Sequence, residues 1–323
     1  MEKEDKILVV ENLRTQFFTY GGVVEALDDV SFEIFNGEIF GLVGESGCGK
    51  SVTVASVMGL VQKPGKVISG KVLLEGEDLL RKSEREMSWI RGSRISVISQ
   101  DPTSSLNPLF KIGYQVSEPM IFHRRVKRKA AWAEAEQLLL RMGVPDPAGK
   151  ARNFPHELSG GMRQRAVIAM ALACNPDLLI ADEPTTNLDV TIERQILNLV
   201  RQLQKYLGTS VLWITHDMAV IAEMCDRVAV MYAGNIVELS DVRTIFKHPA
   251  HPYTVKLLNA IPSAESTAKE LDEIPGAVPQ LIDPPSGCRF HPRCERAMAV
   301  CSGEKPEDVT IEKGHMVACH LYS

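Results

Sequence analysis

The chain has 323 residues, of which 45% are apolar and 24% are charged, and its formal net charge is −5. That length allows two domains and a substantial core, and the acidic balance gives no reason to expect nucleic acid as a partner. No apolar run approaches the roughly 18 residues that span a bilayer, and residues 1–6 carry no apolar signal region. We therefore expect a soluble chain that reaches a membrane only through a partner.

Strand patterns come first along the chain. Val30, Phe32 and Ile34 alternate with polar residues, which is typical of a half-buried strand, and the apolar run 39–43 suits a buried parallel strand. Similar runs follow at 95–98, 178–181 and 211–214. Ligands of open α/β sheets bind beyond the carboxyl ends of the strands. The residues at or soon after these four ends should therefore share one sheet edge: Gly44, Gln100, Asp182 and His216.

Between residues 101 and 155 the strand signal stops, and we expect a mostly helical insertion. Residues 127–142 form a helical pattern that ends before Gly143, and residues 192–207 form an amphipathic one that ends before Gly208. Residues 228–238 are typical of a β-hairpin. These patterns together predict an α/β fold.

A glycine-rich loop follows the run 39–43 and fits the phosphate-binding P-loop pattern. Its glycines let the backbone wrap around phosphate oxygens, which the N–H groups and the following helix N-terminus hold. Lys50 should reach the β- and γ-phosphates, and Ser51 should bind Mg²⁺. Cys48 is expected to be a small loop residue rather than a catalytic thiol. The predicted nucleotide contacts are Gly44, Glu45, Ser46, Gly47, Cys48, Gly49, Lys50, Ser51 and Val52.

Two carboxylates, Asp182 and Glu183, close the run 178–181. A P-loop needs an acidic partner on a neighbouring strand, so Asp182 is expected to hold the Mg²⁺ shell. Glu183 is placed to accept a proton from the attacking water. The alternative is a pair of helix-capping carboxylates before Pro184.

The stretch 158–165, Leu-Ser-Gly-Gly-Met-Arg-Gln-Arg, lies between these two elements. It offers a hydroxyl, two glycines and a helix start, which together make an anion site. With its neighbours in this order, the sequence resembles the ATP-binding-cassette (ABC) ATPases, which adopt a P-loop NTPase fold with a helical subdomain. In that family two subunits enclose two ATP molecules. The resemblance implies that one subunit presents three residues to the γ-phosphate bound by the other: Ser159, Gly160 and Gly161.

The resemblance also suggests roles for other residues. Gln100 would contact Mg²⁺ and the attacking water, and His216 would contact the γ-phosphate. Asp189, with Asn187 and Leu188, resembles the D-loop that links the two sites of a dimer, although that family usually has a small residue in place of Asn187.

An aromatic face for the adenine is expected among Phe17, Phe18 and Tyr20. Phe17 shares a strand face with Leu13 and Thr15 and is the favoured candidate, with Tyr20 as the alternative. Ordinary packing aromatics are the other interpretation.

Three further segments resemble the ATP-binding subunits of dipeptide and oligopeptide ABC importers: residues 101–108, residues 251–254 and the Cys-rich tail. This implies ATP hydrolysis at the cytoplasmic face of the membrane, with a second, identical or related ABC subunit, two permeases and an external peptide-binding protein as partners. Nickel importers are close relatives. Soluble ABC proteins of translation or DNA repair usually carry two cassettes or a long coiled coil, whereas this chain has one cassette and about 130 residues between its Walker motifs.

The composition changes after about residue 248, so we expect an ABC domain over 1–250, with its helical subdomain at about 101–156, and a Cys-rich domain over 251–323. Residues 263–272 are predicted to be a linker or surface helix. Four late cysteines suit either an iron–sulfur cluster or zinc, although Cys-x-x-Cys is absent, and unligated thiols are the third interpretation. The resemblance implies a [4Fe–4S] cluster with a structural rather than a redox-sensing role, bound by Cys288, Cys294, Cys301 and Cys319.

Overall fold

The computed structural model describes residues 5–186, 189–260, 274 and 276–323. The chain forms two compact units whose segments interleave. One unit comprises Met1–Ile7, Phe35–Glu38 and Arg81–Leu212, and the other comprises Leu8–Ile34, Ile39–Leu80 and Trp213–Ser323. We call them the signature unit and the P-loop unit. The predicted boundary at residue 250 stays a prediction, and the predicted linker at 263–272 lies outside the described residues.

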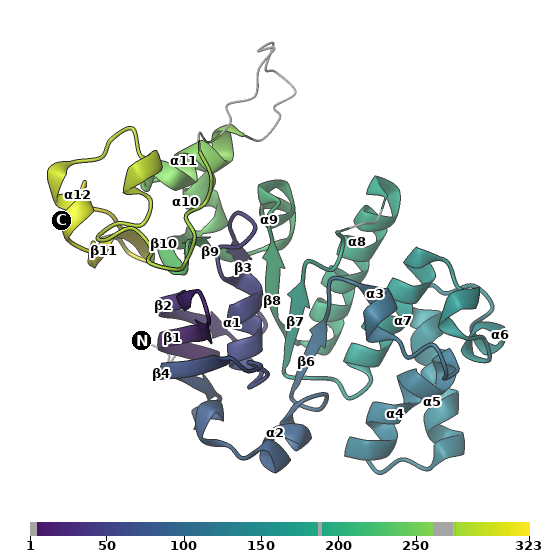
Figure 1. Cartoon of the computed structure of the whole chain (residues 1–323). Coiled ribbons are helices and arrows are strands. Elements are labelled where there is room, and N and C mark those ends of the chain that lie inside the picture. Colours follow the sequence, from purple (N-terminus) through teal and green to yellow (C-terminus); the bar gives the residue numbers. More distant parts are fainter. Residues whose placement is uncertain (1–4, 187–188, 261–273, 275) are drawn as a thin grey trace. The chain divides into compact units, whose positions relative to one another are not determined.

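The first sheet of the P-loop unit has the strand order β2 (Gly22–Phe35), β1 (Lys6–Thr19), β4 (Gly65–Leu74), β5 (Glu77–Asp78) (Figure 1). β1 and β4 are antiparallel, with Val10 opposite Val72. The alternation along β1 buries Leu13 and Thr15. The Thr15 hydroxyl lies 2.8 Å from that of Ser56, so this sheet face packs against α1 (Lys50–Val57).

The predicted strand 39–43 is confirmed as β3 (Ile39–Val43), and all of its residues are buried. It is parallel to β9 (Arg227–Tyr232), which forms the predicted hairpin with β10 (Asn235–Asp241). A Cβ at Gly41 would lie 2.8 Å from Ile221, so the glycine allows α9 (Met218–Met224) to approach β3. The chain continues through α10 (Val242–Lys247) and α11 (Pro252–Asn259).

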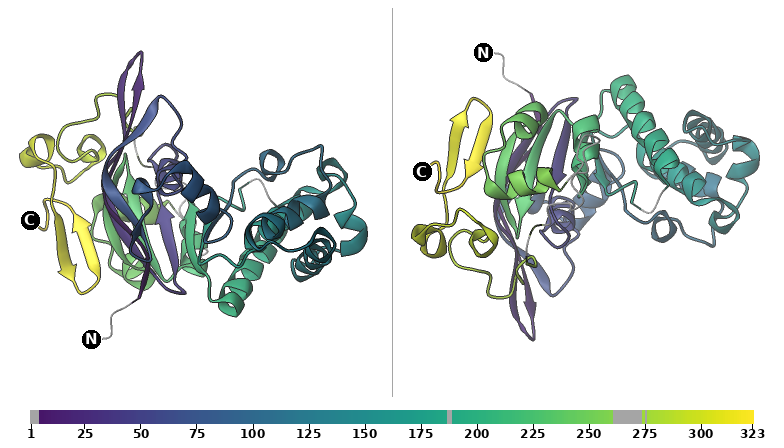
Figure 2. Two further views of the ribbon diagram at one scale, coloured as in Figure 1. Left: turned by 90° about the horizontal axis from the view of Figure 1, so that it is seen from below. Right: turned by 90° about the horizontal axis from the view of Figure 1, so that it is seen from above.

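Residues 276–323, the C-terminal segment, extend this same unit. Its strands are β11 (Asp308–Glu312) and β12 (His315–Ala318), and its helical pieces are η3 (His291–Arg293) and α12 (Ala299–Gly303). β12 pairs with β10, so that Val317 lies opposite Glu238. The buried Glu238 carboxylate accepts hydrogen bonds from the backbone of Ala250 and His251 and lies 2.8 Å from the His315 ring. The segment therefore shares a core with β10, and Figure 2 shows its hairpin beside those strands.

In the signature unit, β6 (Ile95–Ile98) is parallel to β7 (Leu178–Asp182). Here β8 (Ser210–Thr215) begins, and Val211 donates its backbone N–H to Glu38. The predicted helical insertion is confirmed, and its helices gather beside one another in both views of Figure 2. The helices of this unit are α2 (Glu84–Ile90), α3 (Pro102–Ser105), α4 (Ile112–His123), α5 (Arg128–Arg141), α6 (Pro147–Ala151), α7 (Gly160–Leu172) and α8 (Val190–Leu207).

Two of these helices match the patterns in the sequence closely. α5 ends just before Gly143, as expected, and α8 ends at Leu207, where Gly208 adopts a left-handed conformation with φ of 70°. α8 starts two residues earlier than predicted, because the Asp189 carboxylate accepts a hydrogen bond from Ile192 and caps the helix. Among the described residues, no helix combines the length and apolar character that crossing a membrane requires.

Candidate nucleotide site

The P-loop joins the end of β3 to the start of α1. Glycine is required at two of its positions: Gly49 has a φ of 113°, and a Cβ at Gly44 would lie 2.1 Å from the carbonyl oxygen of Met231. Cys48 and Lys50 are buried. Three residues of the loop and helix start are exposed, as a phosphate-binding loop requires: Ser46, Gly47 and Ser51.

The Lys50 ammonium forms hydrogen bonds with the backbone of its own loop. Its Nζ donates to the backbone oxygens of Gly44 at 2.7 Å and Glu45 at 3.2 Å. These are bonds that a phosphate can replace, since an ammonium donates in three directions. Burial raises the pKa of the Cys48 thiol, which keeps it protonated and supports a packing role.

The predicted acidic residues, Asp182 and Glu183, lie in the signature unit. Asp182 ends β7, and Glu183 follows in the left-handed region with φ of 47°. The Glu183 carboxylate accepts hydrogen bonds from the side-chain amide of Gln100 at 3.2 Å and from the hydroxyl of Thr186 at 3.1 Å. Two sequence-predicted residues, Gln100 and Glu183, are thus brought together. Thr186 was missed, because a hydroxyl three residues after a carboxylate carries no distinctive signal.

A buried hydrogen bond holds the turn that follows Glu183. The buried amide of Gln164, in α7, donates to the backbone oxygen of Pro184 at 2.6 Å. This bond connects the helix of the signature stretch to the turn that follows Glu183.

The signature stretch forms a capped helix start. Ser159 is the N-cap of α7, and its hydroxyl accepts from Met162 at 3.4 Å. A Cβ at Gly160 would meet nothing within 4 Å, whereas one at Gly161 would lie 3.1 Å from Ile192. The stretch lines a hollow of about 480 Å³, which Asp189 also borders. Asn187 and Leu188 lie outside the described residues.

His216 and the adenine candidates belong to the P-loop unit. His216 is exposed directly after β8. Phe17 is half-buried, and its ring lies so close to Gly65 that a Cβ there would come within 2.5 Å of it. Tyr20 is fully exposed in the turn between β1 and β2. An aromatic that stacks on a base needs a free ring face, so exposure favours Tyr20 over Phe17. The assembly of the P-loop and signature halves into one site remains a prediction.

The four late cysteines do not form a ready ligand shell. Within residues 5–186, 189–260, 274 and 276–323, no three His, Cys, Asp or Glu side chains are placed to hold a metal ion together. Burial raises the pKa of Cys288 to about 11, and the charges of Cys319, Cys301 and Cys294 add to this effect. The thiols therefore share one region but lack the geometry of a bound cluster.

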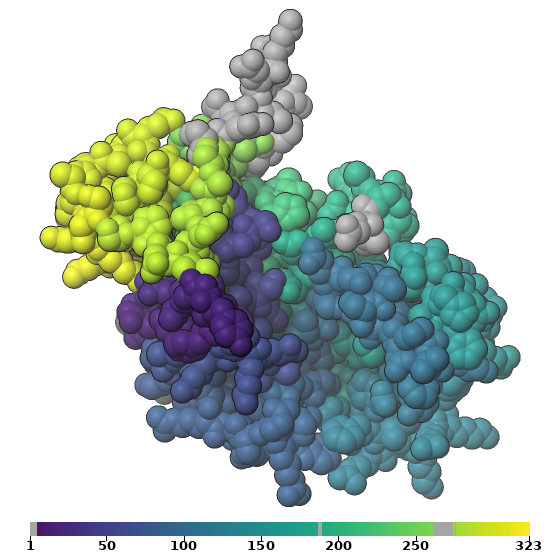
Figure 3. Space-filling view, in the orientation of Figure 1, coloured from purple at the N-terminus to yellow at the C-terminus, as the bar shows by residue number. Residues whose placement is uncertain are grey.

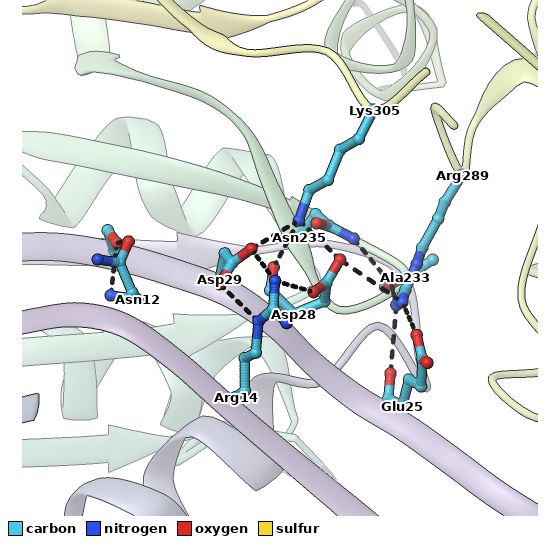
Figure 4. A network of polar contacts seen from close by, with 10 residues as sticks. Asn12, Arg14, Glu25, Asp28, Asp29, Ala233, Asn235, Arg289 and Lys305 are labelled. Atoms are coloured by element: carbon cyan, nitrogen blue, oxygen red, sulfur yellow. Dashed lines mark hydrogen bonds and ion pairs between the residues drawn. The ribbon is translucent and has the colours of Figure 1, made fainter. Parts of the chain in front are cut away.

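Charged residues fasten the C-terminal segment to the first sheet (Figure 4). The buried Arg289 donates to the backbone of Ala233 at 2.7 Å and to the Glu25 carboxylate at 2.5 Å. Lys305 lies 2.6 Å from the Asp28 carboxylate. Figure 3 shows the resulting contact between the segment, in yellow, and β1 and β2, in purple. A cavity of about 310 Å³ lies beside this contact and is bordered by Lys305.

Comparison with known proteins identifies the family of this chain. Residues 27–186 match the family described as ABC transporter, and residues 237–301 match the oligopeptide/dipeptide transporter C-terminal region. The dipeptide transport ATP-binding protein DppD of Bacillus subtilis is 48% identical over 98% of this chain and 95% of its own length. The oligopeptide transport ATP-binding protein OppD of the same organism is 48% identical over 99% of this chain and 90% of its own.

A solved structure gives the same result for the fold. The ATP-binding cassette MJ0796, as a dimer in a post-hydrolysis state with ADP and phosphate, is 27% identical, with a TM-score of 0.66 over 73% of this chain and 99% of its own. The chain therefore belongs to the ABC transporter family and is an ATP-hydrolysing member of its dipeptide and oligopeptide ATP-binding protein group.

Proposed function

We propose that this protein is the ATPase subunit of an ABC importer that takes up dipeptides or oligopeptides. It acts at the cytoplasmic face of the membrane, with a second ABC subunit and two permeases, on cargo from an external binding protein. The observation that carries the proposal is the P-loop and the Gln100–Glu183 pair in a chain 48% identical to DppD. The matched oligopeptide/dipeptide C-terminal region favours transport over a soluble role in translation or repair.

Each residue of the proposed site has a separate role in ATP hydrolysis. The P-loop backbone and Lys50 hold the phosphates of ATP. The Ser51 hydroxyl and the Asp182 carboxylate are hard oxygen donors that fit Mg²⁺, which neutralises charge on the phosphates when bound. Glu183 takes the proton of the attacking water. Gln100, which donates a hydrogen bond to the Glu183 carboxylate, orients that carboxylate and the water. His216 contacts the γ-phosphate.

The signature stretch acts on a second subunit. Ser159 caps α7, Gly160 and Gly161 are its first residues, and all three line the hollow at this helix N-terminus, the end of a helix that favours anions. The open space at Gly160 supports close approach of a partner's γ-phosphate. ATP then stabilises the dimer, and hydrolysis weakens it.

The permeases are proposed to bind the helical region after Gln100. Leu109 and Phe110, just beyond residues 101–108, are 79% and 46% exposed. Exposed apolar side chains of this size are typical of a protein interaction surface. Movement of this region would then shift Gln100 and its bond to Glu183.

The identity of the cargo is tested by measuring the uptake of labelled compounds into cells. Cells that lack this gene, with its permeases present, are supplied with a radiolabelled dipeptide, a labelled pentapeptide or ⁶³Ni²⁺. Return of the gene should restore peptide uptake, and a Lys50→Ala variant made at the same level should not. Restoration of nickel uptake alone would assign the chain to the nickel importers.

A [4Fe–4S] cluster on the four late cysteines is proposed as a structural cofactor. The proposal rests on the family resemblance and on the mutual charge effects of the thiols, and it requires a shift of the segment to bring them into a ligand shell. Anaerobically purified protein should contain about four iron and four sulfide per chain by the stoichiometry of that cluster. Zinc without iron would support the alternative, and neither metal would support free thiols.

A further inference from the structure

Glu45, the second residue of the P-loop, is held from two sides by residues far away in the sequence. Its backbone N–H donates to the Tyr253 hydroxyl at 3.0 Å. Both of its carboxylate oxygens accept from one terminal nitrogen of Arg293, at 3.1 Å each. The Arg293 side chain is 6% exposed and that of Glu45 is 27% exposed, so water screens this ion pair only in part.

Arg293 is itself held firmly by its surroundings. Its other terminal nitrogen donates to the backbone oxygen of Ile274 at 3.1 Å, and its guanidinium carbon lies 5.8 Å from the ring centroid of Tyr232. That ring belongs to an aromatic cluster with Tyr253 and Phe290, whose ring centroids lie 4.7 to 5.4 Å apart. Packed rings leave few alternative rotamers, so the guanidinium is fixed where the Glu45 carboxylate needs it.

The charge of Glu45 matters because of where it lies. The backbone oxygen of Glu45 accepts a hydrogen bond from Lys50, the residue that binds phosphate. A carboxylate in a loop that binds a polyanion repels its ligand unless a cation cancels it. Among the residues that the structure describes, Arg293 supplies the cation that pairs with this carboxylate, and it comes from the C-terminal segment.

We infer that Arg293 is a positioning residue for ATP binding, which acts by cancelling the charge of Glu45 beside the phosphates. The C-terminal segment thereby contributes to the nucleotide site of its own chain. This inference rests on ATP binding at the P-loop, which a Lys50→Ala variant tests separately: unimpaired ATP binding by that variant would contradict the site, whatever Arg293 does.

The test compares the dissociation constant of Mg·ATP, measured by calorimetry on the full chain, in a charge cycle. Arg293→Met should weaken binding about fivefold, in the range of a partly buried ion pair, and kcat at saturating ATP should change little. Addition of Glu45→Gln should restore binding to near the wild-type value. High salt should reduce the defect of Arg293→Met, since salt screens the uncancelled carboxylate.

Arg289→Met is the matched control. It removes the same type of side chain from the same segment, but its partner is Glu25 in the first sheet rather than the P-loop. We expect it to lower the melting temperature and leave the dissociation constant of Mg·ATP unchanged.

Two results would overturn the inference. Wild-type affinity for Mg·ATP in Arg293→Met would contradict the inference. A binding defect that Glu45→Gln does not restore would also contradict it, because it would show that Arg293 only stabilises the structure. If Arg293→Met does not fold, Glu45→Gln alone decides: charge cancellation requires equal or tighter ATP binding, whereas weaker binding would contradict it.

Discussion

The P-loop and the signature stretch both begin a helix with glycines, yet their surroundings differ. A Cβ at Gly44 would collide with the backbone of Met231, whereas a Cβ at Gly160 would meet nothing. The P-loop is enclosed by its own unit and held by Tyr253 and Arg293, while the signature stretch faces an open hollow. This difference fits our proposal that the P-loop binds phosphate within its own chain, whereas the signature stretch acts on the phosphate of a partner.

The largest expected effect is on hydrolysis. Glu183→Gln keeps the shape of the side chain and its contact with Gln100 but removes the base, so ATP turnover should fall at least about 100-fold. The same variant should accumulate an ATP-bound dimer, visible by size-exclusion chromatography with light scattering. Glu193→Gln, in the first turn of α8, is the control and should keep wild-type turnover. Normal turnover in Glu183→Gln would remove its assignment as the base.

The enclosed glycine should be costly to replace in a single chain. Gly44→Ala forces Met231 and the end of β3 to shift, so the free energy of unfolding should fall by about 1–3 kcal/mol. Urea denaturation of the nucleotide-free protein measures this. Gly37→Ala, at a positive φ but with open space around it, measures the cost of backbone strain without a collision. A loss well below about 1 kcal/mol in Gly44→Ala would show that the collision is relieved.

The buried imidazole of His251 predicts that the stability of the protein is sensitive to acid. Burial lowers the pKa of His251 to about 3, from 6.5. The unfolded chain therefore binds a proton that the folded chain excludes, and stability is lost as pH falls from about 6.5 toward 3. Between pH 7 and pH 5 the loss from this group should be about 1–2 kcal/mol. His251→Asn keeps a cap for Tyr253 and should flatten that part of the profile in urea titrations. An unchanged profile would count against the role of His251.

The open glycine should affect only the dimer. Gly160→Ala should leave the melting temperature of the nucleotide-free chain unchanged, because its Cβ has free space. It should lower ATP turnover by roughly tenfold, since the methyl group lies where a partner's phosphate must approach. Thermal melts and ATPase rates at two protein concentrations check both parts. A lower melting temperature with normal turnover in Gly160→Ala would show that Gly160, like Gly44, is needed for packing rather than for the dimer.

Local signals were enough for much of the fold. The apolar runs became β3, β6 and β7, and the periodic patterns became α5 and α8, because burial selects residues at the period of each element. The P-loop was also readable from its glycines, since Gly49 has a positive φ and a Cβ at Gly44 would collide with the backbone of Met231. The signature helix began where Ser159 and its glycines indicated.

Contacts between distant segments could not be predicted in this way. Arg293 lies 248 positions from Glu45, and Thr186 is one hydroxyl among many, so neither carries a local pattern. Likewise, the Cys spacing suggested a cluster, yet ligand distances depend on how the segment packs.

The sequence by itself predicted the chemistry, namely which residues would bind phosphate and which carboxylate would act as a base, and it indicated the family that the comparisons confirm. Tertiary structure alone decided which charges meet, as when Arg293 reaches Glu45 and Gln100 reaches Glu183. The physical reason is that periodicity and glycine conformations act over a few residues, whereas ion pairs and buried hydrogen bonds arise only once the whole chain has packed.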